Sequence, residues 1–297
     1  MNDFSKYEQQ RKAVYAKVKL FFASSAILAS IAIIFIIWLT SSEKQGVFLP
    51  LIIVFFLSSV ILLAVGLSIK GKFFQMIKTE LVAKYFEQKY PNLRYSPKNG
   101  LPQSLVTSGG LLKRPDRYSS EDLVEGDYKG VRFQVSDCTL EDESTDSEGN
   151  TTYHTYFSGR YFVYEFKRRF SDILRICEKF DFVDKKNLIK VETESIKFTK
   201  KFKIFASSVQ FAFYILTPTT IEKLTALEEK YKGKISFYLH DCEFHVAIND
   251  NKNYMEIKLR NEISEKTYET FDEDIQVIFS IIDDFNLASD RFNVNIK

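Results

Sequence analysis

The sequence predicts a membrane-anchored α+β protein: a two-helix transmembrane hairpin, followed by a cytoplasmic domain with a mainly antiparallel sheet and segregated helices. Two long apolar runs near the amino terminus predict the hairpin. Later strand-like runs with few helices between them predict the sheet. We therefore expect a cytoplasmic segment of residues 1–19, a hairpin of residues 20–69 and a domain of residues 70–297.

The two apolar runs are the strongest signal in the chain. Leu20–Ser42 contains no Lys, Arg, Asp or Glu over 23 residues, and Gln45–Ile69 contains none over 25. At about 1.5 Å of rise per residue, each run can cross a hydrocarbon core roughly 30 Å thick as a helix. A cleaved signal peptide would have a shorter apolar core, and soluble helices rarely stay apolar on every face. We place the spans at about 20–41 and 47–69.

Cations flank both runs on their outer sides. Cytoplasmic flanks retain Lys and Arg, and short loops weigh most in that rule. We therefore expect a multi-pass protein of the cell membrane, with both termini in the cytoplasm. The cations are Lys6, Arg11, Lys12, Lys17 and Lys19 before the first run, and Lys70, Lys72, Lys78 and Lys84 after the second.

The elements of the domain follow from the spacing of its apolar residues. Residues 74–85 predict an amphipathic helix, and residues 120–124 predict a short capped helical turn. An acidic loop at 141–150 predicts a long hairpin between two alternating strands. The expected strands are 131–135, 152–166, 188–191, 202–205, 211–216, 235–239, 244–248 and 254–259, and the expected helices begin at Pro218 and cover 271–285, with Asp272, Glu273 and Asp274 in the first turn of the latter.

Two groups of residues contain potential metal ligands. The acidic loop offers several carboxylates, but their spacing is not that of a calcium-binding EF-hand, which favours a solvated hairpin tip. In a strand, His240 and His245 would point to opposite faces, and a turn between two strands at this point is favoured. We therefore expect neither a stoichiometric metal nor a cofactor.

Other function classes have little support. The formal net charge of +2 is too close to balance to indicate nucleic acid as a partner. No G-x-S-x-G, P-loop or G-x-G-x-x-G sequence occurs. No catalytic or cofactor-binding residue can be named, although an active site that is assembled only in space stays open.

Basic residues near the spans are candidates for contact with anionic lipid. Each cation close to such a surface contributes about 1 kcal/mol. An ordinary solvated edge is the alternative interpretation. The candidate lipid-facing residues are Lys70, Lys72, Lys78, Lys167, Arg168 and Arg169.

Five segments follow one another in a recognisable order. They are Arg117–Gly126, Gly130–Ser136, Tyr156–Phe162, Phe198–Ser207 and Tyr214–Pro218. This succession resembles the bacterial membrane proteins grouped as domain of unknown function 3137. The likeness covers roughly residues 73–287 and the two preceding spans. It implies the layout of the chain, and it brings no activity or catalytic residues with it.

We expect a membrane-anchored binding or scaffolding module that recruits a protein or senses a ligand at the inner face of the membrane. A membrane protein or a second copy of the chain is a possible partner. The alternative is a membrane-tethered hydrolytic enzyme of unrecognised type. An auxiliary subunit of a transporter also fits the topology, but neither span contains an ionisable residue to mark an ion path.

Overall fold

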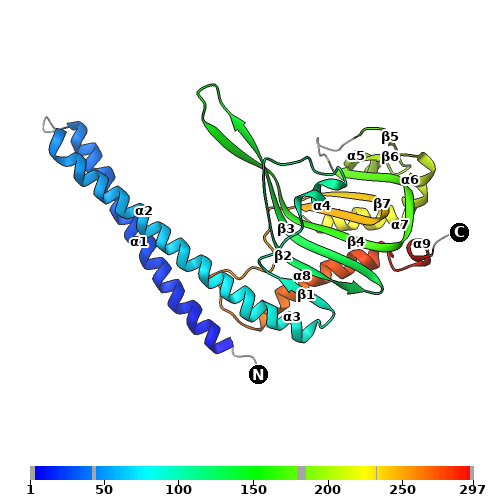
Figure 1. Ribbon diagram of the computed structural model, residues 1–297, viewed down its shortest axis with the longest axis horizontal. Coiled ribbons are helices and arrows are strands. Elements are labelled where there is room, and N and C mark those ends of the chain that lie inside the picture. Colours follow the sequence, from blue (N-terminus) through cyan, green and yellow to red (C-terminus); the bar gives the residue numbers. More distant parts are fainter. Residues whose placement is uncertain (1–3, 42–44, 179–184, 232, 295–297) are drawn as a thin grey trace. The chain divides into compact units, whose positions relative to one another are not determined.

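The computed structural model describes residues 4–41, 45–178, 185–231 and 233–294 (Figure 1). The chain forms two compact units. The helical unit consists of Met1–Val82 and Glu256–Thr270, and the sheet unit consists of Ala83–Met255 and Phe271–Lys297. Residues 256–270, here called the clasp segment, therefore join the amino-terminal helices although they come from the last fifth of the chain.

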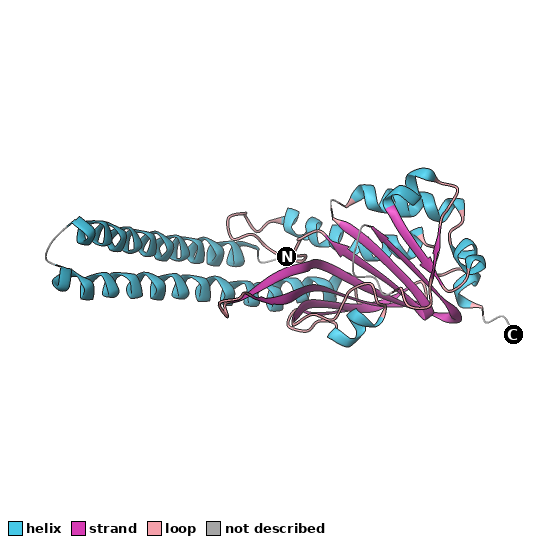
Figure 2. Cartoon of the chain, turned by 90° about the horizontal axis from the view of Figure 1, so that it is seen from above, coloured by secondary structure: helices cyan, strands magenta, loops and turns pink. Residues whose placement is uncertain are grey.

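The helical unit contains two long antiparallel helices, which lie side by side in both views (Figures 1 and 2). Helix α1 spans Phe4–Ser41 and α2 spans Gln45–Ile77, continuing into a π-helical turn, η1, at Lys78–Val82. Both are long and apolar enough to cross a membrane, by length and composition.

Paired serines join α1 to α2 midway along their length. The Ser25 and Ser59 hydroxyls each donate a hydrogen bond to the other residue's carbonyl, both at 2.9 Å. Gly66 allows a close approach, because a Cβ there would lie 2.7 Å from the Phe22 ring. Most other apolar side chains of the two helices point outward and are exposed, which suits a hydrocarbon environment rather than water.

The sheet unit contains one antiparallel sheet, which confirms the predicted α+β class. In the described residues its strand order is β1-β2-β3-β4-β6-β5, and β7 also pairs with β4. The register between β4 and β7 shifts on either side of Phe170, where the long strand β4 bends. The strands are β1 Leu93–Ser96, β2 Arg117–Tyr128, β3 Val131–Thr145, β4 Thr151–Glu178, β5 Ile189–Val191, β6 Phe202–Ala206 and β7 Lys234–Asn249.

Helices cover the sheet, and α8 lies along one of its faces (Figures 1 and 2). Its buried stripe includes Phe271, Ile275, Ile278 and Ile282. The Tyr164 hydroxyl of β4 donates a hydrogen bond to the Ile278 carbonyl at 3.1 Å, which fixes α8 against the sheet. The helices are α3 Ala83–Lys89, α4 Gln103–Ser108, α5 Ile196–Lys201, α6 Val209–Ile215, α7 Pro218–Lys230, α8 Glu265–Asp284 and α9 Asp290–Asn293.

Several predicted elements are confirmed. The strands predicted at 131–135, 152–166 and 202–205 occur, the strand predicted at 188–191 covers Ile189–Val191, and β3 and β4 form the predicted acidic hairpin. Helix α7 begins at Pro218, and the Thr217 hydroxyl caps it by accepting a hydrogen bond from the Thr220 amide.

Two predicted strands are wrong in kind. Residues 211–216 fall largely in helix α6, because the Ser208 hydroxyl accepts a hydrogen bond from the Phe211 amide and so starts a helix. Residues 254–259 form no strand and lead instead into the clasp segment.

Three further expectations are corrected at their boundaries. The predicted helical turn at 120–124 is part of β2, and Asp122 adopts a left-handed conformation (φ 59°) where the register shifts. The runs 235–239 and 244–248 belong to one strand, β7, which stays continuous through Asp241 at φ 50°. Helix α8 begins at Glu265, so residues 272–274 lie beyond its first turn.

Candidate functional site

A groove of about 850 Å³ opens in the helical unit, where α1, α2 and the start of the clasp segment meet. Its volume falls in the range of sites that hold small ligands. Its wall is mainly apolar, and its lining also includes four cations. The apolar lining includes Val18, Phe22, Ala23, Leu67, Gly71, Phe74, Ile257 and Leu259, and the cations are Lys19, Lys70, Lys258 and Arg260.

Helical spacing explains the two long sides of the groove. Tyr15, Val18 and Phe22 recur at intervals of three and four residues, so they lie on one stripe of α1. Leu67 and Phe74, two turns apart, lie on one stripe of α2. A Cβ at Gly71 would find no atom within 4 Å, so the absent side chain leaves open space there.

The third side is formed by an alternating segment. Ile257 and Leu259 are buried, with 6% and 8% of their surfaces exposed, whereas Glu256, Lys258 and Arg260 are exposed. This alternation predicted a strand. The segment instead turns its apolar pair into the groove of the helical unit, because a period of two requires only one buried face and does not specify a sheet.

A buried ion pair fastens this segment to α1. Arg11 donates hydrogen bonds from Nη2 and Nε to the two carboxylate oxygens of Glu8, at 2.6 and 2.7 Å. Arg11 Nη1 also donates to the Leu259 carbonyl at 2.6 Å, and the Ile263 amide donates to Glu8 at 2.9 Å. The rings of Phe4 and Tyr268 add an aromatic contact, with centroids 4.9 Å apart.

The ion pair stabilises the ionised form of Glu8. The hydrogen bonds from Arg11 lower the pKa of the Glu8 carboxyl to about 2 from 4.5. Burial opposes this effect, and the Ile263 amide adds to it. Glu8 is therefore ionised at neutral pH, and both of its oxygens are bonded within the clasp.

The four cations that line the groove are here called the cationic rim, and their surroundings differ from those of Arg11. In the described part of the chain, none of Lys19, Lys70, Lys258 and Arg260 has a carboxylate within 4 Å, whereas Arg11 is bonded to Glu8. Lys70 lies over the Phe74 ring at 5.5 Å. Lys19 directly precedes the first apolar run and Lys70 directly follows the second, so the rim marks the edge of both runs.

Lys70 is thus the candidate lipid-facing residue that the structure places in the groove. Lys72 is exposed on α2 but does not line the groove. Lys78 is buried in η1, with 5% of its surface exposed, and is not available to a lipid surface. The sequence reasoning missed Lys258 and Arg260, because no local pattern connects them with the spans.

The remaining candidates lie on β4 in the sheet unit, outside the groove. Lys167 is exposed. Arg168 donates hydrogen bonds to the Tyr214 hydroxyl at 2.8 Å and the Arg291 carbonyl at 3.0 Å. Arg169 donates to both carboxylate oxygens of Asp241, at 2.7 and 3.0 Å. These two arginines therefore already have partners within the sheet unit.

The histidines of β7 have separate environments. His240 Nδ1 lies 3.2 Å from the Asp172 carbonyl. His245 is fully buried, with the Tyr161 hydroxyl 3.0 Å from Nδ1 and the Glu243 carboxylate 2.9 Å from Nε2. Within the described residues, no group of three His, Cys, Asp or Glu side chains is arranged to hold a metal ion. The hydroxyl beside His245 belongs to a buried tyrosine, Tyr161, rather than to a serine.

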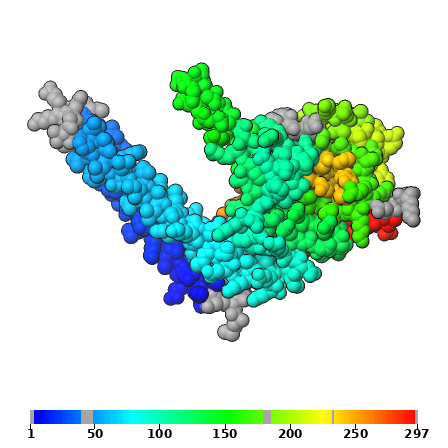
Figure 3. Space-filling model, in the orientation of Figure 1, coloured from blue at the N-terminus to red at the C-terminus, as the bar shows by residue number. Residues whose placement is uncertain are grey.

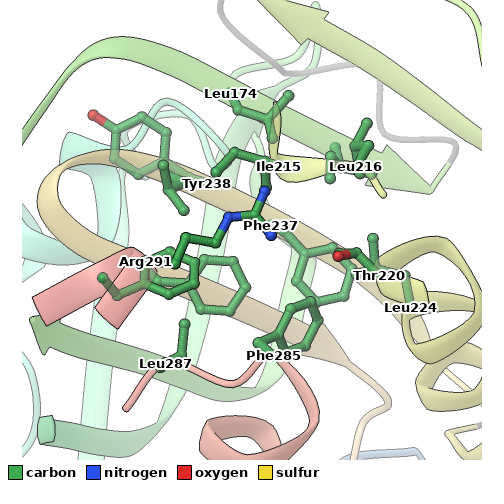
Figure 4. Close-up of a pocket in the computed structure, with 14 residues that line it drawn as sticks. Leu174, Ile215, Leu216, Thr220, Leu224, Phe237, Tyr238, Phe285, Leu287 and Arg291 are labelled. Carbon is green, nitrogen blue, oxygen red and sulfur yellow. The ribbon is translucent and has the colours of Figure 1, made fainter. Parts of the chain in front are cut away.

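A second cavity lies inside the sheet unit, between β4, β7, α6, α7 and the chain around α9. Figure 4 shows the Arg291 side chain reaching among the surrounding apolar side chains, including Leu174, Ile215 and Phe237. Its volume of about 20 Å³ leaves room for about one water molecule. The groove of the helical unit is therefore the better candidate for a ligand site.

Comparison with known proteins agrees with the resemblance seen in the sequence. The family model described as "Protein of unknown function (DUF3137)" matches residues 155–287. The match runs from β4 to Leu287, just after α8, and includes Lys258 and Arg260 of the cationic rim.

One solved structure is distantly similar to the chain. It is the crystal structure of the mycobacterial trehalose monomycolate transport factor A, TtfA, at 6% sequence identity and a TM-score of 0.39. The alignment covers 68% of this chain and 95% of that one. A likeness at this TM-score assigns neither fold nor function. No curated protein matches the chain.

Proposed function

We propose that this protein is a membrane-anchored binding module that senses a lipid-like amphiphile at the inner face of the cell membrane. The single observation that carries the proposal is the groove, which combines an apolar wall with a cationic rim where the two apolar runs end. An amphiphile presents the same combination of an apolar tail and a polar head.

The apolar wall supplies the affinity in this proposal. Each buried methylene group of a ligand contributes about 0.8 kcal/mol. Phe22 and Leu67 lie at the ends of the two spans and Phe74 lies just beyond the second, so a chain entering from the hydrocarbon layer meets the apolar wall first at Phe22 and Leu67. A lipid already dissolved in the bilayer can therefore reach the groove by lateral diffusion.

In this proposal the two spans determine where the groove lies in the membrane. Helices α1 and α2 would hold the groove at the level of the headgroups, and the cations outside both runs favour the cytoplasmic leaflet. The sheet unit would then lie in the cytoplasm, where it could pass the state of the groove to a partner.

A photoactivatable fatty acid that carries a diazirine tests the proposal on the full-length protein in mild detergent. Mass spectrometry should place the crosslinks on residues 15–23, 67–74 and 256–260. The variant Gly71→Trp should strongly reduce them, because its indole would project into the groove from a position where a Cβ meets no atom within 4 Å.

Ile61→Trp is the matched control, because Ile61 is an exposed residue of α2 outside the groove. It adds the same indole to the same helix, and its crosslinks should match those of the wild type. Equal crosslinking of Gly71→Trp and the wild type, or crosslinks spread evenly along both helices, would show that the groove is not the binding site.

A further inference from the structure

We propose that the ligand of this groove is an anionic phospholipid, whose phosphate is bound by the cationic rim. This inference rests on the proposed function and names the class of lipid. It depends on the charge around the groove rather than on its apolar wall.

The lining carries an excess of positive charge. Four cations face one carboxylate, that of Glu256. The cations come from three elements that are far apart in the sequence: Lys19 from α1, Lys70 from α2, and Lys258 with Arg260 from the clasp segment. Folding therefore gathers like charges around one opening, an arrangement that an anionic ligand would stabilise.

Among the described residues, the rim cations lack the carboxylate partner that Arg11 and Lys12 of the same unit have. Arg11 and Lys12 both lie beside Glu8, at 2.6 and 3.7 Å. In the described residues the rim cations have no such carboxylate, so their donors are available to an outside anion. Arg260 offers a planar fork of donors, which matches two oxygens of a phosphate, and the lysines act as point charges.

The clasp determines where two of these cations lie. Leu259, whose carbonyl accepts the hydrogen bond from Arg11, lies between Lys258 and Arg260 in the sequence. Because Ile257 and Leu259 point into the groove, the exposed side chains between and beside them are held at its opening. Arg11 and Glu8 therefore act as positioning residues for the rim.

A phosphate group at the rim can belong to a lipid headgroup or to free inorganic phosphate. The apolar wall favours the lipid, because free phosphate gains nothing from Phe22, Leu67 or Phe74. The test therefore compares three additions to the full-length protein in mild detergent: phosphatidylglycerol, phosphatidylcholine and inorganic phosphate. Thermal unfolding gives the apparent affinity for each.

Phosphatidylglycerol should raise the melting temperature of the wild type at lower concentration than phosphatidylcholine, and inorganic phosphate should have little effect. In Lys258→Gln/Arg260→Gln, affinity for phosphatidylglycerol should fall roughly 30-fold, since each cation near an anionic headgroup contributes a factor of about five. Affinity for phosphatidylcholine should change little, because the apolar wall is intact.

The matched control is Lys17→Gln/Lys72→Gln. It removes the same charge from the same unit, at two exposed positions that do not line the groove, and should retain the preference for phosphatidylglycerol. An equal loss in both double variants, or no loss in either, would overturn the proposal, as would a response to inorganic phosphate alone. Co-purification of the wild type with a second protein that covers the groove would also overturn the proposal.

The two proposals can fail separately. Suppose that Gly71→Trp reduces the fatty-acid crosslink while Lys258→Gln/Arg260→Gln keeps the preference for phosphatidylglycerol. The groove then binds an amphiphile without recognising its headgroup. If Gly71→Trp has no effect on the crosslink, the groove is not the binding site and the proposed function fails first.

Discussion

At the scale of single residues, the pair Glu8 and Arg11 shows what the sequence reveals and what it hides. Their spacing of three residues is visible in the sequence and is compatible with an ion pair on one face of a helix. Their other partners, Leu259 and Ile263, lie 248 and 255 residues away. No local rule gives such contacts, because they depend on how the chain returns to its own amino terminus.

Replacing Glu8 should release the clasp. Glu8→Gln leaves Arg11 buried without a carboxylate, and breaking a buried pair in this way costs about 3–5 kcal/mol. Amide exchange at Ile263 should quicken by at least tenfold, measured by hydrogen–deuterium exchange on the full-length protein. Lys12→Gln is the control, because Lys12 is largely exposed and such pairs contribute at most about 1 kcal/mol. Unchanged exchange in Glu8→Gln would show that the clasp does not depend on this pair.

The same pair predicts an acid-sensitive contact. Because the pKa of Glu8 is lowered from 4.5 to about 2, its contribution to stability is present in full above pH 4.5 and is lost as the pH falls toward 2. Protection of the clasp segment, corrected for the intrinsic exchange rate, should therefore stay constant from pH 7 to about 5 and decline below that. In Glu8→Gln this decline should be smaller. An identical pH profile in both proteins would assign the decline to other carboxyl groups.

At the scale of elements, apolar patterns predicted burial better than they predicted partners. The run at 211–216 is apolar throughout, and such a run is compatible with either a strand or a helix. Ser208, the helix cap, was the local signal that could have decided it. The alternation at 254–259 correctly indicated one buried face. Its partner is an apolar groove between helices, which the pattern alone cannot identify.

The β3–β4 hairpin projects from the body of the sheet unit as a narrow arm (Figure 3). Near its tip, Ser144 pairs with Thr152 and Glu143 pairs with Tyr153. Replacing residues 144–152 by Asn-Gly keeps the register from Glu143 and Tyr153 downward, because this dipeptide favours a two-residue hairpin turn. The melting temperature should stay within a few degrees, since the removed residues are exposed and the loop becomes shorter.

A variant that is shifted out of register serves as the control for the hairpin. Replacing residues 142–150 by the same Asn-Gly would place Glu141 next to Thr151 across the turn instead of opposite its native partner Thr155, and would remove the ion pair of Asp142 with Lys113. It should be clearly less stable than the in-register variant. A large loss of stability in the in-register variant, or calcium-dependent stability in the wild type, would identify the tip as an ordered binding site.

At the scale of the whole molecule, the sequence predicted the hairpin-forming helices and the antiparallel sheet. It did not predict that the clasp segment would join the helices. The two ends of this segment continue into the sheet unit, where the Tyr254 amide donates a hydrogen bond to Asp137 at 2.6 Å and the Met255 amide donates to Asp274 at 3.0 Å. The clasp segment is therefore continuous in sequence, at both of its ends, with chain that is held within the sheet unit.

The arrangement in the membrane is testable with single cysteines in a background where Cys138, Cys177 and Cys242 are replaced by alanine. The cations outside both apolar runs predict that Ser5→Cys and Lys98→Cys face the cytoplasm, and that Ser42→Cys, between the runs, faces outward. A membrane-impermeant maleimide should label only Ser42→Cys in intact cells. After permeabilisation it should label all three, because Ser5 and Lys98 are exposed, so that lack of labelling in intact cells reports the membrane barrier. Labelling of Lys98→Cys in sealed cells would put the cationic rim against the outer leaflet and exclude a site for lipids of the inner face.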